Sequence, residues 1–162
     1  MTRITVILAT VLSLAFTPVA AQDFQKGLAA YQAGDYATTL QEWIPSAEAG
    51  DVFAQYNLGI MYANGEGVPQ DYAEAFKWYR LAADQGDADA QYNLGFMYEN
   101  GQGVLQDNVM AHMWYNIASA NGHDKAGEWR DERAGLMTSA DISKAQAMAR
   151  ECMGSGYKKC GY

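Results

Sequence analysis

Two nearly identical stretches follow one another in this sequence at a spacing of 36 residues. Residues 54–87 and 90–123 are identical at 19 of 34 positions, with no gap between the aligned copies. A repeat of this length is one small structural unit that cannot bury its apolar face alone, so neighbouring units must stack on one another. The repeat therefore predicts an array of stacked units.

Each copy has the pattern of two helices. In the first copy apolar residues recur at spacings of three and four, as on one face of a helix, and these residues are Ala54, Leu58, Met61 and Tyr62. The pattern predicts helices over residues 51–64 and 71–85, and over 87–100 in the second copy. Gly65 follows the first helix and suits a helix end, because glycine accepts a positive φ.

Weaker copies flank the two clear ones. We divide the chain into units of about residues 24–50, 51–86, 87–122 and 123–153, followed by a C-terminal tail. The loop inside the first unit is about five residues shorter than in the clear copies, and Thr138 begins a capping-box-like sequence before a last helix over 142–153. End units are expected to differ, because each covers a core edge that no further repeat covers.

A glycine lies inside the first helix of both clear copies, as Gly59 and Gly95. A glycine in a helix interior costs about 1 kcal/mol relative to alanine, so its recurrence indicates a reason in the packing. We expect the neighbouring helix to approach closely at these positions, with Trp78 or Trp114 covering the site.

The residues that the two copies share resemble a known repeat. The pattern A-x-x-x-L-G-x-M-Y-x-N-G-x-G-V-x-x-D, followed by A-x-x-W-Y-x-x-A and a glycine, is similar to the Sel-one-like repeat, a relative of the tetratricopeptide repeat. The resemblance implies an all-α solenoid of stacked antiparallel helix hairpins, wound into a right-handed superhelix with a concave face. It also implies an adaptor or regulator that binds other proteins, of the exported bacterial type.

The first 21 residues have the three-part pattern of a secretory signal peptide. Arg3 precedes an apolar run over residues 4–16, Pro18 interrupts it, and small residues end the segment at Ala21. We expect cleavage after Ala21, which leaves residues 22–162 as one helical-repeat domain in the periplasm or outside the cell. The run is shorter than the about 20 residues that span a bilayer, and no membrane insertion is expected after cleavage. The alternative is a buried N-terminal helix.

The chain without this segment is strongly acidic, with 10 basic and 19 acidic residues and a formal net charge of −9. Such a surface repels phosphate backbones and anionic lipid headgroups. We therefore do not expect nucleic acid as a partner. We expect a protein or peptide partner, and we expect the protein itself to be a monomer.

No set of residues in the sequence has the pattern of a catalytic site, a cofactor site or a metal site. His112 stands where the first copy has Phe76, which indicates a packing position, and His123 stands where it has Asp87, in a turn expected to be exposed. No H-E-x-x-H, C-x-x-C, G-x-S-x-G or Walker pattern is present. The recurring tyrosines fit core packing or an aromatic cage, and the acids between repeats fit solvated turns or calcium binding. We expect no enzyme activity and no cofactor.

Cys152 and Cys160 are the two cysteines, eight residues apart near the C-terminus. In an exported chain a disulfide is the natural interpretation. Closing this nine-residue loop stabilises a fold by about 2.6 kcal/mol on the chain-entropy estimate. A pair of free thiols or a redox couple is the alternative.

Solenoids of this kind bind partners along a concave groove, and by analogy with tetratricopeptide repeats the first helix of each unit lines it. The candidate groove residues lie off the apolar stripe of those helices and are Phe53, Asn57, Ile60, Asn64, Asp89, Asn93, Phe96 and Asn100. Asn57 and Asn93 either bind the partner's backbone or hydrogen-bond within the repeat.

The leading functional hypothesis is a non-enzymatic, protein-binding adaptor or regulator in the cell envelope. One alternative is a cell-wall enzyme or ligand binder, since some cysteine-rich exported relatives are described as penicillin-binding or β-lactamase-like. Those relatives have a cysteine pair in each repeat, whereas the two clear repeats here have none. The other alternative is a secreted factor that binds a host protein.

Overall fold

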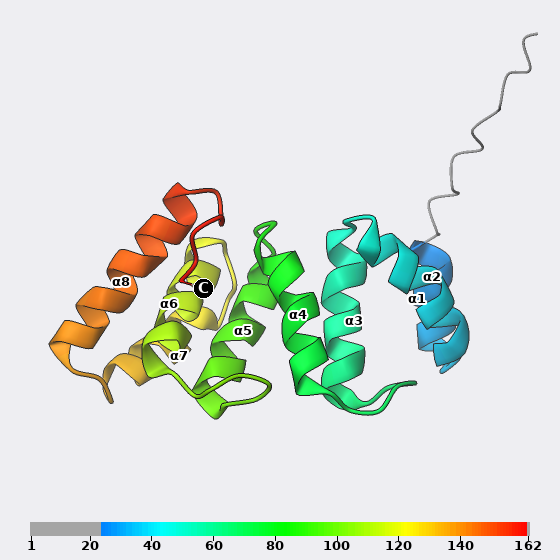
Figure 1. The fold of residues 1–162 in the computed structure, drawn as a ribbon, viewed down its shortest axis with the longest axis horizontal. Helices are drawn as coiled ribbons and strands as arrows, with labels where there is room; N and C mark the ends of the chain where they lie inside the picture. The colour runs from blue at the N-terminus through cyan, green and yellow to red at the C-terminus, as the bar shows by residue number, and fades with distance from the viewer. Residues whose placement is uncertain (1–23, 162) are drawn as a thin grey trace, which may run out of the picture.

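The computed structural model describes residues 24–161, so the expected signal peptide and its cleavage site lie outside the described residues. Every regular element within that range is an α-helix. The helices are α1 (Phe24–Gln32), α2 (Tyr36–Glu48), α3 (Val52–Asn64), α4 (Tyr72–Ala83), α5 (Ala88–Asn100), α6 (Asn108–Ala120), α7 (Ala126–Ala134) and α8 (Ser139–Gly154). They succeed one another along the long axis of the molecule (Figure 1), which confirms the all-α solenoid of helix hairpins.

The ends of the helices in the two clear repeats are set by local capping. Asp51 and Asp87 precede α3 and α5, and the carboxylate of each accepts a 2.7 Å hydrogen bond from the backbone N–H three residues later. Gly65 and Gly101 end the same helices with φ of 75° and 65°, a conformation that glycine adopts without a Cβ clash. These caps place the helix ends within two residues of the predicted ones.

The glycines inside α3 and α5 lie against aromatic rings of the second helix in each hairpin. A Cβ on Gly59 would lie 2.5 Å from the Tyr79 ring, and one on Gly95 would lie 2.7 Å from the Tyr115 ring. The predicted close approach is confirmed, but the prediction that Trp78 or Trp114 covers these sites is wrong. Each tryptophan precedes the covering tyrosine by one residue, and successive residues of a helix point about 100° apart.

Two buried glutamines tie each repeat to the one before it. The Gln55 amide donates to the backbone oxygen of Ala47, and the Gln91 amide donates to that of Ala83, at 2.9 and 3.0 Å. Each glutamine oxygen accepts a second hydrogen bond, from Gln85 or from Asn121. Because a buried amide without partners is costly, these bonds fix how each first helix joins the preceding hairpin.

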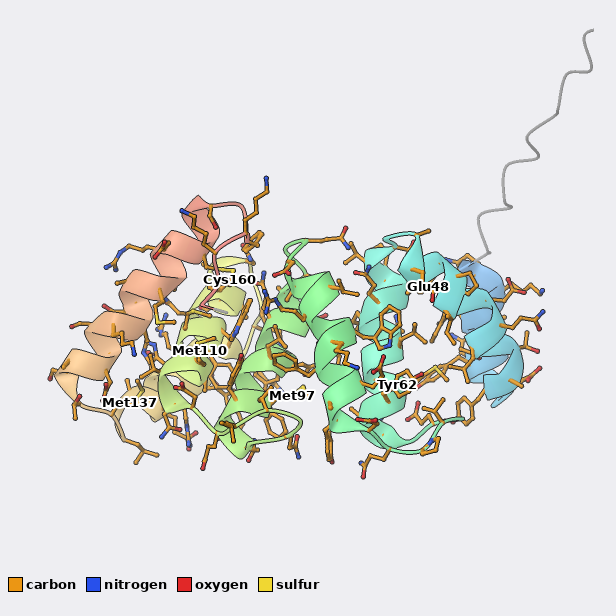
Figure 2. All side chains as sticks on the ribbon, viewed as in Figure 1. Glu48, Tyr62, Met97, Met110, Met137 and Cys160 are labelled. Atoms are coloured by element: carbon orange, nitrogen blue, oxygen red, sulfur yellow. A yellow bond between two sulfur atoms is a disulfide. The ribbon has the colours of Figure 1, made fainter. Side chains whose placement is uncertain are left out.

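The C-terminal unit covers the second helix of the second clear repeat. Helix α8 packs on α6, and it begins at Ser139, three residues before the predicted start, because the Thr138 side chain caps it. Cys152 and Cys160 form a disulfide with their Cα atoms 4.5 Å apart, and the chain after it brings Gly161 against Met110 of α6. Figure 2 labels Cys160 and Met110 on this side of the molecule.

None of the helices within residues 24–161 is long and apolar enough to cross a membrane.

Candidate partner-binding face

The eight candidate groove residues all lie on α3 and α5 or directly at their ends. Two of them are large, exposed aromatic side chains: Phe53 is 64% exposed and Phe96 is 38% exposed. Asn64, Asp89 and Asn100 are also exposed, whereas the remaining three are half-buried and are Asn57, Ile60 and Asn93. The face of these two helices therefore combines exposed aromatic rings with amide groups.

Several of the asparagines already have partners inside the protein. The side-chain N–H of Asn57 donates to the backbone oxygen of Phe53 at 2.7 Å, and that of Asn100 donates to the backbone oxygen of Phe96 at 2.9 Å. Asn64 donates to the Glu66 carboxylate at 2.9 Å. Each of these amide nitrogens thus has a hydrogen-bond partner inside the protein. For the side-chain N–H of Asn57, this agrees with the interpretation that Asn57 hydrogen-bonds within its repeat.

A cavity of about 230 Å³ lies between α3, α4 and α5. It brings together three of the candidate residues, Asn64, Asn93 and Phe96, while the other five lie outside its lining. The rest of the lining consists of Ala63, Tyr72, Tyr79, Met97 and Gln102; Figure 2 labels Met97 on α5. The lining is uncharged and mixes aromatic rings with three side-chain amides.

Tyr79 is the buried polar residue of this cavity. The residue is 5% exposed, and its hydroxyl makes no hydrogen bond to any residue from 24 to 161. Burial raises the pKa of Tyr79 well above its usual value, so the hydroxyl keeps its proton and is available as a donor. The repeat pattern predicts this tyrosine in the core but does not predict its contribution to the cavity. The signal that could have found it is the change from Glu99 in the second copy to Ala63 in the first.

Both histidines are engaged in contacts within the protein. His112 is 2% exposed, in keeping with the packing position predicted for it, and burial lowers its pKa. The prediction that His123 is exposed is wrong: it is half-buried, and its ring stacks on Tyr92 with centroids 4.2 Å apart. Its Nδ1 accepts a 3.1 Å hydrogen bond from the backbone N–H of Ala126, just as the Asp87 carboxylate accepts one from the backbone N–H of Ala90 in the preceding repeat.

Among residues 24–161, no three His, Cys, Asp or Glu side chains lie close enough together to hold a metal ion.

Comparison with known proteins agrees with this architecture. The family model of the Sel1 repeat matches residues 52–87 and 88–123. The crystal structure of a Sel1 repeat protein from Oxalobacter formigenes is similar to this chain, with 39% sequence identity and a TM-score of 0.63 over 71% of this chain and 89% of that one. The chain belongs to the Sel1 repeat family.

A second Sel1-like structure is a protective antigen present in uropathogenic Escherichia coli strains, which displays an SLR fold. It has 27% sequence identity and a TM-score of 0.75 over 81% of this chain, but this chain spans only 30% of the antigen's length. No curated protein matches the sequence. Sel1 repeats typically mediate protein–protein interactions, so the family assigns protein binding to this fold in general terms.

Proposed function

We propose that this Sel1 repeat protein is an exported, non-enzymatic adaptor of the bacterial envelope that binds a protein or peptide across α3 and α5. The observation that carries the proposal is the exposure of Phe53 and Phe96 on these helices. Aromatic side chains supply much of the energy at protein interfaces, where they act as anchors in the centre of the contact. The proposed binding residues are Phe53, Asn57, Ile60, Asn64, Asp89, Asn93, Phe96 and Asn100.

Two features support export. The N-terminal segment has the order of charge, apolar run and small residues typical of a signal peptide cleaved after Ala21. The Cys152–Cys160 disulfide also suits an oxidising compartment such as the periplasm or the cell exterior. The intact mass of the protein recovered from the envelope fraction tests this part, and a mass that retains residues 1–21 would contradict it.

Paired substitutions test the binding face. Partners are captured from an envelope extract with the wild type and identified, and their affinity is then measured for a Phe53→Ala/Phe96→Ala double variant. We expect the affinity to fall at least tenfold, because each anchor commonly contributes more than about 1 kcal/mol. Leu81→Ala on α4 is the matched control, since Leu81 is 46% exposed but lies outside the proposed face. Equal affinities for the double variant and the wild type would refute this face as the binding site.

The second candidate function is a secreted factor that contacts a host protein. The similarity to a protective antigen of uropathogenic Escherichia coli strains favours it. Cell fractionation separates the two candidates, because an envelope adaptor stays in the periplasm whereas a host-directed factor accumulates in the culture medium or on the cell surface.

A further inference from the structure

The cavity between α3, α4 and α5 is one of three equivalent places in the molecule. At each place a glycine in the first helix of a hairpin packs against an aromatic ring of the second helix, as Gly27 does against Trp43. The helix that follows the hairpin in the chain completes the place. We name these places the first junction (α1, α2, α3), the middle junction (α3, α4, α5) and the last junction (α5, α6, α7). One helical turn after the glycine, the three junctions have Tyr31, Ala63 and Glu99 respectively.

Tyr31 fills the first junction. Its ring centroid lies 5.5 Å from that of Trp43 and 5.8 Å from that of Tyr36. Its hydroxyl donates a 2.6 Å hydrogen bond to the Glu66 carboxylate, and this bond together with burial raises the pKa of Tyr31 to about 12. The first junction is therefore closed by a phenol from the chain itself.

Glu99 fills the last junction. Its carboxylate accepts a 2.7 Å hydrogen bond from the Tyr115 hydroxyl and lies 3.3 Å from an Arg133 guanidinium nitrogen. The charge of this carboxylate is thus compensated within the junction. A different side chain closes this junction, but it again comes from the first helix of the hairpin, here α5.

The middle junction has Ala63 at the same position, and there the cavity of about 230 Å³ remains. The surroundings of Tyr31 nevertheless recur in it. Tyr72 comes directly after its helix cap as Tyr36 does, Tyr79 packs on the glycine as Trp43 does, and Gln102 occupies the loop position of Glu66; all three recurring residues line the cavity. The middle junction therefore keeps the neighbours of a phenol but lacks the phenol.

We propose that the middle junction is a specificity pocket that receives a tyrosine side chain of the bound partner, in the way that Tyr31 occupies the first junction. The volume of the cavity, about 230 Å³, is sufficient for a tyrosine ring, because a cavity of about 150 Å³ holds a benzene molecule. It is also smaller than the roughly 300–1,000 Å³ of typical small-molecule sites. A carboxylate fits less well, since Met97 stands where the last junction has Arg133 and offers no compensating charge.

The proposal rests on the proposed function, since the pocket opens beside Phe96 on the same face. It adds the chemistry of one residue of the partner: an aromatic ring between Tyr72 and Tyr79, with a hydroxyl that donates to the Gln102 side-chain oxygen. The Tyr79 hydroxyl, which has no partner among residues 24–161, donates to the incoming phenol oxygen.

The test uses p-cresol, the side chain of tyrosine, as the probe and NMR titration of residues 22–162 as the readout. We expect saturable shifts of the Asn93, Phe96 and Met97 resonances with p-cresol and none with propionate at equal concentration. Ala63→Tyr, which copies Tyr31, fills the pocket and should weaken p-cresol binding at least tenfold. Ala147→Tyr, at an exposed alanine of α8, is the matched control and should leave binding unchanged.

Ala63→Glu copies Glu99 and serves as a second, smaller filling variant if Ala63→Tyr folds poorly by thermal melting. Absence of saturable p-cresol binding, or equal binding in the filled variants, would overturn the pocket. If partners captured through Phe53 and Phe96 bind the filled variants as tightly as the wild type, the pocket's role is overturned while the proposed function stands. Saturable p-cresol binding that is lost on filling supports the pocket even if no protein is captured.

Discussion

The two clear repeats have the same pattern, yet their second helices have different surroundings. Helix α4 buries one stripe, made up of Ala75, Tyr79, Ala82 and Ala83. Helix α6 buries most of its circumference, with Met110, Ala111, His112, Met113, Trp114, Tyr115, Ile117 and Ala118. The reason is that α8 packs on α6. Burial in a solenoid is therefore set by the next unit along the chain as well as by the repeat's own pattern.

The residues that differ between the copies reflect this division. Lys77 of α4 has a side chain that is 67% exposed, while Met113 at the same position of α6 is fully buried. Ala63 of α3 leaves a cavity over Tyr79, while Glu99 of α5 closes the space over Tyr115 with a hydrogen bond. The shared positions thus build the hairpin, and the variable ones adapt it to its neighbours.

The largest expected effect on stability comes from giving one repeat the residue of the other at the position of Lys77 and Met113, in two separate variants. Met113→Lys places a charge without a partner in the cluster that α6 shares with α8, and an uncompensated buried charge costs about 3–5 kcal/mol. Lys77→Met is the control and should change stability by less than about 0.5 kcal/mol, as is usual at exposed positions. Urea unfolding of both variants measures the difference. Similar losses in the two variants would show that α8 does not cover α6 in solution.

A smaller effect is expected from Gly59→Val and Gly95→Val. Either side chain would be forced against a tyrosine ring, and overpacking of this kind costs about 1–3 kcal/mol. The loss should be larger at Gly95, because the Tyr115 ring is held by Glu99, whereas the Tyr79 ring can move toward the cavity. Thermal unfolding compares them, with Gly154→Ala as the control at a site that has open space. A larger loss at Gly59 would contradict the open middle junction.

The smallest effect at neutral pH is expected from His112→Phe, which copies Phe76 of the sister repeat. Apolar substitutions of similar size usually change stability by less than about 1.5 kcal/mol, and this one also removes a buried Nδ1 that has no hydrogen-bond partner among residues 24–161. Partner affinity should be unchanged. A folded variant that has lost its partner would show that His112 has a role beyond packing.

The same variant should also change the pH dependence of stability. Burial, together with the smaller effect of the Arg130 charge, lowers the pKa of His112 below its usual value of 6.5. The unfolded chain therefore takes up the proton at a higher pH than the folded protein does, so the wild type loses stability as the pH falls below about 6.5. His112→Phe should lose less stability over that interval, as chemical unfolding at pH 7 and pH 5 would measure.

The sequence by itself determined the repeat, the helices and their caps. Asp51, Gly65 and Thr138 act through hydrogen bonds or backbone angles within a few residues of themselves, so their effect can be predicted from neighbouring letters. The recurrence of Gly59 and Gly95 likewise predicted a close approach of two helices in one hairpin.

Only the tertiary structure decided which groups meet between units. The ring over Gly59 is that of Tyr79 rather than Trp78, and the His123 ring accepts a hydrogen bond from the backbone N–H of Ala126 rather than facing solvent. The cavity beside Ala63 exists because three helices from two repeats leave one position unfilled. Such contacts depend on how residues from separate units pack in space, and the spacing of residues within one helix does not specify that packing.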